Sequence, residues 1–257
     1  MKVTRIAVVG AGTMGNGIAG QAAMCGYEVV LNDVDDQRIA HGFEMIEGTW
    51  QKGMQRGKLS QSDLDSARGR LLSSSDMASA IAEVDLVIEA VPERIELKRS
   101  LFSQFEAHAP ASAILASNTS SLSIDAIAGA VSDPTRVVGM HFFNPVAASK
   151  LVELVSGSAT SPDVLSAVRA VSEQMGKQCI EVKDSPGFAT SRLGITLGNE
   201  AMRMFQEGVA SAADIDKAMV LGYKHPIGPL ALTDLVGLDV RLAITEHLFE
   251  QFGTDTF

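Results

Sequence analysis

A glycine-rich turn between an apolar run and a helix-like stretch constrains the fold of this chain more than any other feature. Residues 5–10 read RIAVVG, a short β-branched run, and residues 13–26 are rich in small side chains that suit a closely packed helix. EVVLND at residues 28–33 predicts the next strand. Strand, tight turn, helix and strand in this order are the βαβ unit of a parallel sheet.

The turn reads Gly10-Ala-Gly12-Thr13-Met14-Gly15. A lone GxGxxG is weak evidence, but here it follows a strand and opens a helix, as a dinucleotide-binding turn requires. We expect Gly10 to permit the tight turn, Gly12 to let the backbone approach a pyrophosphate, and Gly15 to let helix and strand pack closely. The helix start at Thr13 and Met14 would present free N–H groups to the phosphates.

Asp33 ends the second predicted strand, eighteen residues beyond Gly15. Its carboxylate can accept hydrogen bonds from the adenosine ribose hydroxyls. A ribose 2′-phosphate would meet Asp33 with Asp35 and Asp36 close by, so the sequence predicts NAD rather than NADP. The alternative, a glycine-rich packing motif with a surface aspartate, does not account for the whole βαβ context.

The rest of the chain divides into two parts. We predict further strands at 84–93, 136–145, 150–155 and 177–182, and a strand that breaks into a polar loop over 113–123. We predict helices at about 35–57, 60–71, 94–109 and 161–175. After KDSPGF (183–188) no strand-like run appears, and residues 186–207, 211–222 and 228–252 have helical patterns. The predicted fold class is therefore α/β, with a Rossmann-type doubly wound sheet over 1–185 followed by an all-helical domain over 186–257.

A histidine and a glutamate stand out among residues with core character. His141 follows the apolar run RVVGM, and Glu153 lies within the next one, KLVELV. A histidine after a strand is commonly a core residue bonded to a backbone carbonyl. However, ligands of open α/β sheets bind at the carboxyl ends of strands, and a buried glutamate is rare unless it is paired. We therefore interpret His141 and Glu153 as a catalytic pair, in which the carboxylate orients the imidazole that serves as general base.

The segment SNTSSLS adds hydroxyls and an amide at another predicted strand end. Ser117 and Asn118 could contact a substrate oxygen or the nicotinamide. A serine- and threonine-rich turn with helix capping at Ser121 or Ser123 explains the same pattern equally well.

Charge and cysteine content limit the class of partner. The 257 residues carry a formal net charge of −10, which disfavours nucleic acid as a partner, because phosphate backbones require a basic surface. No segment approaches the ~20 apolar residues of a membrane span, and the N-terminus lacks the features of a signal peptide. Cys25 and Cys179 lie far apart without metal-ligand spacing. We expect a cytoplasmic protein with reduced thiols and no metal site.

Seven segments of the sequence together resemble a known family. VVGAGTMGNGIA, IEAVPE, ASNTSSLSI, HFFNPV, KLVELV, DSPGF and HPIGPLALTDLVGLD occur in this order and cover nearly the whole chain. Together they resemble the L-3-hydroxyacyl-CoA dehydrogenases, including bacterial 3-hydroxybutyryl-CoA dehydrogenases. The resemblance implies oxidation of an L-3-hydroxyacyl-CoA to the 3-ketoacyl-CoA with NAD, the reverse reaction, and a homodimer formed through the helical domain. It also implies a place in fatty-acid β-oxidation, butanoate metabolism or phenylacetate degradation.

The resemblance also implies roles for single residues. His141 would be the general acid/base with Glu153 as its partner, and Ser117 would bond the substrate oxygen. Other matched positions would contact the cofactor or CoA. They are Asn144 near the nicotinamide, Glu93 and Lys98 at the cofactor, and Thr49 and Arg56 at CoA, for which a solvated helix face is an equally good explanation.

Two departures from the family pattern stand out. The family commonly reads PGFxxNR after the junction, with the asparagine facing the substrate, whereas this chain reads PGFATSR and has Ser191 there. We expect catalysis to survive with altered substrate anchoring. The family also usually ends in a tail rich in glycine and lysine, whereas this sequence ends in QFGTDTF, so we expect a cofactor site without that tail's lysine.

Two other functions remain open from the sequence. One is a related NAD-dependent dehydrogenase of a free hydroxy acid or sugar acid, similar to L-gulonate dehydrogenases, which would have no need for a basic patch near Arg56. The other is a non-catalytic NAD-binding protein, which would have no need for a histidine paired with a buried glutamate.

Overall fold

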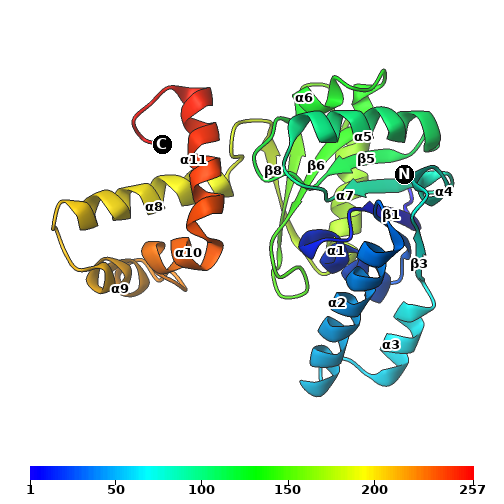
Figure 1. Cartoon of the computed structure of the whole chain (residues 1–257), viewed down its shortest axis with the longest axis horizontal. Coiled ribbons are helices and arrows are strands. Elements are labelled where there is room, and N and C mark those ends of the chain that lie inside the picture. The colour runs from blue at the N-terminus through cyan, green and yellow to red at the C-terminus, as the bar shows by residue number, and fades with distance from the viewer. The chain divides into compact units, whose positions relative to one another are not determined.

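The computed structural model describes all 257 residues, which form two compact units, Met1–Asp184 and Ser185–Phe257 (Figure 1). The predicted boundary lay between residues 185 and 186. None of the helices combines the length and the apolar character needed to cross a membrane.

The first unit is built on one eight-stranded sheet with the strand order β3-β2-β1-β4-β5-β6-β7-β8. The strands are β1 (Arg5–Val9), β2 (Glu28–Asn32), β3 (Leu71–Ser74), β4 (Leu86–Glu89), β5 (Ile114–Ser117), β6 (Val137–Phe142), β7 (Leu151–Ser156) and β8 (Gln178–Lys183). The central strands β4, β5 and β6 are buried along their whole length, as expected for a sheet covered on both faces.

Strands β1 to β6 run parallel, and β7 runs antiparallel to β6. The reversal follows from the connection, because residues 143–150 are too few for the crossover that a parallel neighbour needs. The register places His141 directly opposite Glu153. β8 then pairs parallel with β7 after the crossover helix α7.

Seven helices belong to the first unit. They are α1 (Thr13–Met24), α2 (Asp36–Gln55), α3 (Gln61–Arg68), α4 (Met77–Ile81), α5 (Ile95–His108), α6 (Ile124–Ala128) and α7 (Pro162–Gln174), and a 3₁₀ turn, η1, covers Pro134–Arg136. Ser60 and Asp63 form a reciprocal capping box at the start of α3. In Figure 1, α2 and α3 extend beyond the β1–β3 side of the sheet.

Three short elements escaped the sequence-based prediction. Residues 60–71 were expected to be helical, but α3 ends at Arg68 and the chain enters the edge strand β3 at Leu71. Only one of the four β3 residues is buried, so its apolar pattern is weak. The other two, α4 and α6, have five residues each, too few for a 3.6-residue periodicity to be recognised.

The second unit contains no strand, as predicted, and it has four helices where three were expected. They are α8 (Thr190–Gln206), α9 (Ala212–Gly222), α10 (Pro229–Val236) and α11 (Leu238–Phe252). The expected single helix over 228–252 was wrong, because it breaks at Gly237, whose φ of 100° is unfavourable for other residues.

Candidate active site

The glycine turn after β1 has the shape that a dinucleotide requires. Gly10 has a φ of 106°, and a Cβ there would lie 2.6 Å from the Ala90 carbonyl oxygen. A Cβ at Gly15 would lie 1.6 Å from the Gly10 oxygen, so turn and helix can approach only without side chains. At Gly12 an added Cβ meets nothing within 4 Å, which leaves open space in front of the α1 N-terminus for an anionic group.

Asp33 supports this turn directly. Its Oδ2 accepts a hydrogen bond of 2.7 Å from the Ala11 N–H, and its Oδ1 accepts one of 2.7 Å from the Val34 N–H. Each carboxylate oxygen keeps a second lone pair, so ribose hydroxyls can still bind. Of the two residues at the helix start, Thr13 is exposed and lines the pocket described below, whereas the Met14 side chain is half-buried against the core.

The structure pairs His141 with Glu153 inside the sheet. His141 Nδ1 lies 2.7 Å from Glu153 Oε2 across the β6–β7 ladder. Glu153 is fully buried and His141 is 7% exposed, so the carboxylate has its imidazole partner in a site shielded from water. Phe143 packs against the imidazole with ring centroids 4.4 Å apart, which further limits rotation of the ring.

The loop after β5, which we call the hydroxyl loop (residues 117–121), lies beside the end of β6. Asn118 Oδ1 accepts a hydrogen bond of 2.9 Å from the Phe142 N–H, one residue beyond His141. This bond turns the Asn118 amide so that its NH₂ group points away from the strand backbone. Asn118 is therefore bonded to the residue that follows His141 on β6, and its contact with a substrate or the nicotinamide stays a prediction.

Ser117 does not occupy the position expected for it. Its hydroxyl is fully buried and donates its one hydrogen to Glu89 Oε2 at 2.6 Å. A sealed hydroxyl whose hydrogen is already used is not available to a substrate oxygen. Ser120, by contrast, is a partly exposed residue of this loop. The sequence reasoning missed it, because a run of serines does not reveal which residue is exposed.

Lys98 lies almost entirely inside the protein. Its ammonium is 1% exposed and lies 2.6 Å from Glu89 Oε1 and 3.2 Å from Glu93 Oε2. It is therefore paired inside the protein, and its contact with a cofactor stays a prediction. We call Glu89, Lys98 and Glu93 the buried trio.

Glu93 connects the trio to the hydroxyl loop. Its Oε1 accepts hydrogen bonds from the Thr119 hydroxyl and from the Ser120 N–H at 2.8 Å. Burial works to raise the pKa of the Glu93 carboxyl, but the Lys98 ammonium and these hydrogen bonds lower it by more, so the pKa lies below its ordinary value. Glu93 thus remains ionised at neutral pH.

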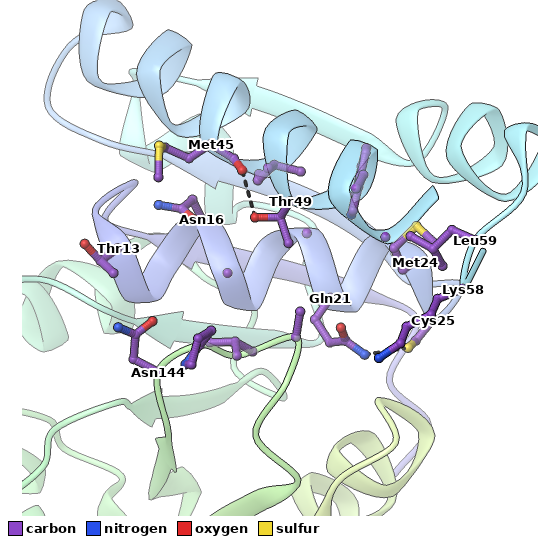
Figure 2. A pocket seen from close by; sticks show the side chains of 18 residues that line it. Thr13, Asn16, Gln21, Met24, Cys25, Met45, Thr49, Lys58, Leu59 and Asn144 are labelled. Carbon is purple, nitrogen blue, oxygen red and sulfur yellow. Dashed lines mark hydrogen bonds between the residues drawn. The ribbon is translucent and has the colours of Figure 1, made fainter. Parts of the chain in front are cut away.

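A pocket of about 520 Å³ runs along one face of α1 (Figure 2). Thr13 and Asn144 lie at the end near the glycine turn, and Lys58 and Cys25 lie at the other end. The lining residues of α1 run from Thr13 to Met24, and its twelve residues span about 18 Å. Gly17 gives room to Val146 of the opposite wall, since a Cβ at Gly17 would lie 2.9 Å from its side chain.

The two residues predicted for CoA have different positions. Thr49 lines the pocket, and its hydroxyl donates to the Met45 carbonyl at 3.0 Å. Arg56 is exposed just after α2 and is not among the lining residues, whereas Lys58 is. The sequence therefore predicted a basic group here but not which side chain would face the pocket.

Lys177 holds in place the loop that forms the pocket wall opposite α1. Its ammonium donates to the Val146 carbonyl and, at 2.8 Å, to the Ser149 carbonyl in the loop between β6 and β7. Burial lowers the pKa of Lys177 from its ordinary value. Ser191, by contrast, lies in the first turn of α8 in the second unit, half-buried, and its contact with substrate stays a prediction.

Comparison with known proteins matches both units. The family model described as "3-hydroxyacyl-CoA dehydrogenase, NAD binding domain" matches residues 5–185, and "3-hydroxyacyl-CoA dehydrogenase, C-terminal domain" matches residues 187–257.

Individual relatives agree with these matches. A probable 3-hydroxybutyryl-CoA dehydrogenase of Bacillus subtilis is 40% identical over 100% of this chain and 89% of its own length. The 3-hydroxybutyryl-CoA dehydrogenase of Clostridioides difficile is 40% identical over 97% of this chain and 88% of its own. The crystal structure of (S)-3-hydroxybutyryl-CoA dehydrogenase from Ralstonia eutropha superposes with a TM-score of 0.95 at 42% identity, covering 99% of this chain and 90% of that one.

Proposed function

The chain belongs to the 3-hydroxyacyl-CoA dehydrogenase family, and on that basis we propose that it interconverts a short-chain L-3-hydroxyacyl-CoA and the 3-ketoacyl-CoA with NAD. The observation that carries the proposal is the buried His141–Glu153 pair, which a protein that only binds NAD would not need. Within this class we propose 3-hydroxybutyryl-CoA as the substrate, because the names of several relatives contain this compound.

The residues present fit NAD. The open space at Gly12 would receive the pyrophosphate at the start of α1. The Asp33 carboxylate would accept hydrogen bonds from the adenosine ribose hydroxyls and would repel a 2′-phosphate. Asn144, at the same end of the pocket as Thr13, lies where the nicotinamide would reach. When bound, NAD supplies the acceptor for the hydride that leaves C3 of the substrate.

His141 moves the proton of the reaction. In the oxidation direction the C3 hydroxyl gives its proton to Nε2, as the C3–H bond breaks and the carbonyl forms. Glu153 holds Nδ1 and stabilises the imidazolium by a charge-assisted hydrogen bond. In the reverse direction the same nitrogen returns the proton to the carbonyl oxygen.

The hydroxyl loop holds the reacting oxygen. We assign this role to the Ser120 hydroxyl and the Asn118 amide rather than to Ser117, because Ser120 and Asn118 are partly exposed and Ser117 is sealed. Asn118 is fixed by the Phe142 N–H, so its NH₂ group is already oriented when the substrate arrives.

The pocket along α1 accommodates the pantetheine arm. An extended arm of four to five peptide-sized units spans roughly 15 Å, comparable with the length of α1. The thioester would lie toward Asn144, and the CoA phosphates would lie toward Lys58, with Arg56 nearby in the sequence. This local positive charge offsets an overall net charge of −10.

We propose a homodimer formed through the second unit, in the cytoplasm. Large apolar side chains are unusually exposed on its helices, as a subunit interface requires. They include Leu193, Phe205, Leu221, Leu235, Leu238, Leu242 and Phe249. Both cysteines are unpaired thiols, which suits a reducing compartment.

The test of the substrate class follows NADH absorbance with acetoacetyl-CoA and, separately, with free acetoacetate. We expect rapid NADH consumption with the thioester only, and slower consumption when NADPH replaces NADH. Equal turnover of the free acid would instead indicate a hydroxy-acid dehydrogenase, and no turnover of either substrate by protein that binds NADH would indicate a binding protein.

A further inference from the structure

The single tryptophan of the chain places a hydrogen-bond donor in the pocket along α1. Trp50 is 4% exposed and lines the pocket from α2. Its indole nitrogen lies beside α1, since a Cβ at Gly20 would come within 3.6 Å of it. This nitrogen has no hydrogen-bond partner in the protein and is not among the unpaired side-chain atoms that are sealed from solvent. A buried tryptophan usually finds a partner for its N–H, so this one is left to a group in the pocket.

Gln21 places an acceptor in the same pocket. Its Nε2 donates to the Met175 carbonyl at 3.0 Å and to the Cys25 sulfur at 3.5 Å. These two bonds use both hydrogens of the amide and set its orientation, so Oε1 is the atom that still lacks a donor. Gln21 lines the pocket, and Figure 2 shows it leaving α1 on the side away from Thr49, the neighbour of Trp50 in the sequence.

The pocket surface around these two groups is mostly apolar. The Thr49 hydroxyl already donates its hydrogen to the Met45 carbonyl. The other lining residues nearby are glycines or have apolar side chains: Gly20, Met24, Ile46, Gly53 and Leu59. One donor and one acceptor on otherwise apolar walls are what orients a bound molecule in such a pocket.

A trans secondary amide matches this donor and acceptor. Its C=O and N–H point in opposite directions, so an amide lying across α1 can accept from the Trp50 N–H and donate to Gln21 Oε1 at once. The pantetheine arm of CoA contains two such amides, an inner one next to the cysteamine and an outer one between the pantoyl and β-alanine parts.

Distance along α1 favours the outer amide. In an extended arm the outer amide nitrogen lies roughly 9 Å from the sulfur, and the inner one roughly 4 Å. Gln21 follows Thr13 by eight residues of α1, or about 12 Å along the helix axis. With the thioester toward Asn144, at the Thr13 end of the pocket, the outer amide comes closer to Gln21 than the inner one does.

We propose that Trp50 and Gln21 bind the outer amide of the pantetheine arm, with the Trp50 N–H donating to its carbonyl and Gln21 Oε1 accepting from its N–H. The inference rests on the proposed function, because it places an acyl-CoA in this pocket. It makes the two residues determinants of specificity for the full arm, since a shorter carrier without the outer amide leaves both groups unpaired. The amide is remote from C3, so the two bonds act on KM rather than on kcat.

The experiment compares two substrates that both lack phosphates. Acetoacetyl-pantetheine has both amides, whereas acetoacetyl-N-acetylcysteamine has only the inner one. For wild type, Trp50→Phe and Gln21→Met, kcat and KM are measured with NADH and each thioester. The matched control is Gln55→Met at the exposed end of α2, outside the pocket.

The expected result is a selective rise in KM. Trp50→Phe and Gln21→Met should each raise KM for acetoacetyl-pantetheine about 3- to 10-fold, the effect of losing one hydrogen bond. KM for acetoacetyl-N-acetylcysteamine should change less than about twofold, and Gln55→Met should behave as wild type with both substrates.

The N–H of Trp50 can also be removed without a change of shape. Because the chain has one tryptophan, biosynthetic replacement of tryptophan by benzothienylalanine puts a sulfur in place of this N–H and alters no other residue. The substituted protein should show the same selective rise in KM, and it takes the place of Trp50→Phe if that variant does not fold.

Two kinds of failure are distinguishable. A rise in KM with both thioesters, or with neither, would overturn the inference and leave the proposed function standing. No turnover of acetoacetyl-CoA or of either shorter thioester by wild type would refute the proposed function and the inference with it.

Discussion

Two buried polar clusters lie on the same sheet and differ in one respect. The His141–Glu153 pair joins β6 to β7, and the buried trio of Glu89, Lys98 and Glu93 joins β4 to α5 and the hydroxyl loop. Both contain a fully buried carboxylate. The partner of that carboxylate is an imidazole in the first and an ammonium in the second.

This difference separates chemistry from support. An imidazole can take up and release a proton near neutral pH, so a carboxylate beside it stabilises the positive charge that forms when the proton is taken up. An ammonium keeps its proton, so the carboxylates beside it hold a fixed geometry. Two equally buried carboxylates can therefore differ in function. The basic side chain beside each carboxylate decides whether its cluster can act as an acid or a base.

The largest expected effect is on kcat, when the side chain that takes up and returns the proton is removed. His141→Ala should lower kcat by roughly 10²- to 10⁴-fold, because general acid–base catalysis contributes that much, while NADH affinity stays nearly unchanged. Steady-state kinetics with acetoacetyl-CoA and an NADH titration measure the two quantities. The matched control is His41→Ala on the exposed face of α2. Turnover within a few-fold of wild type would contradict the assignment.

Replacing the lysine of the buried trio should lower the free energy of unfolding. Lys98→Met leaves Glu89 without its ammonium, and breaking a buried pair in this way lowers the free energy of unfolding by roughly 3–5 kcal/mol. Urea denaturation measures the change, with Lys183→Met on β8, which is exposed, as the control. A loss below about 1 kcal/mol, the size expected of a surface pair, would mean that the trio does not act as a support.

A smaller effect concerns the choice of cofactor. Asp33→Ala removes the acceptor for the ribose hydroxyls and the repulsion of a 2′-phosphate, so the ratio of kcat/KM for NAD over NADP should fall about tenfold, or about 1.4 kcal/mol. The variant also loses the hydrogen bond to the Ala11 N–H, so the absolute rate with NAD should fall too. An unchanged ratio would show that Asp33 supports the turn and does not read the ribose.

The smallest effect lies at the far end of the pocket. Lys58→Met should raise KM for acetoacetyl-CoA about two- to fivefold, since an exposed ion pair contributes ~0.2–1 kcal/mol. A truncated thioester, acetoacetyl-N-acetylcysteamine, has no phosphates and should show the same KM in both proteins. A rise with both substrates would mean that Lys58 shapes the pocket rather than binding phosphate.

Sequence reasoning recovered what periodicity and motif spacing encode. The βαβ unit, the glycine turn, the helical second unit and the pairing of His141 with Glu153 are all visible from local patterns, and the structure contains each of them. The antiparallel direction of β7 follows from the short connection, although it was not predicted.

Within the candidate site, the errors fell where the direction of one side chain matters. Within SNTSS the sequence does not reveal that Ser117 turns inward to Glu89 while Ser120 remains partly exposed. Likewise, Arg56 and Lys58 are two residues apart after the same helix, and only Lys58 lines the pocket. These orientations depend on tertiary contacts outside the motif, which no periodicity carries.

The comparison is tested most directly by the pH–rate profiles of Glu153→Gln and Glu93→Gln measured beside wild type between about pH 6 and pH 9. We expect Glu153→Gln to lower the rate and to change the shape of the profile, because a neutral amide cannot stabilise the imidazolium. Glu93→Gln should lower the rate without changing the shape, since the lowered pKa of Glu93 keeps it ionised across this range. An unchanged profile for Glu153→Gln would contradict the assignment of the moving proton to the His141–Glu153 pair.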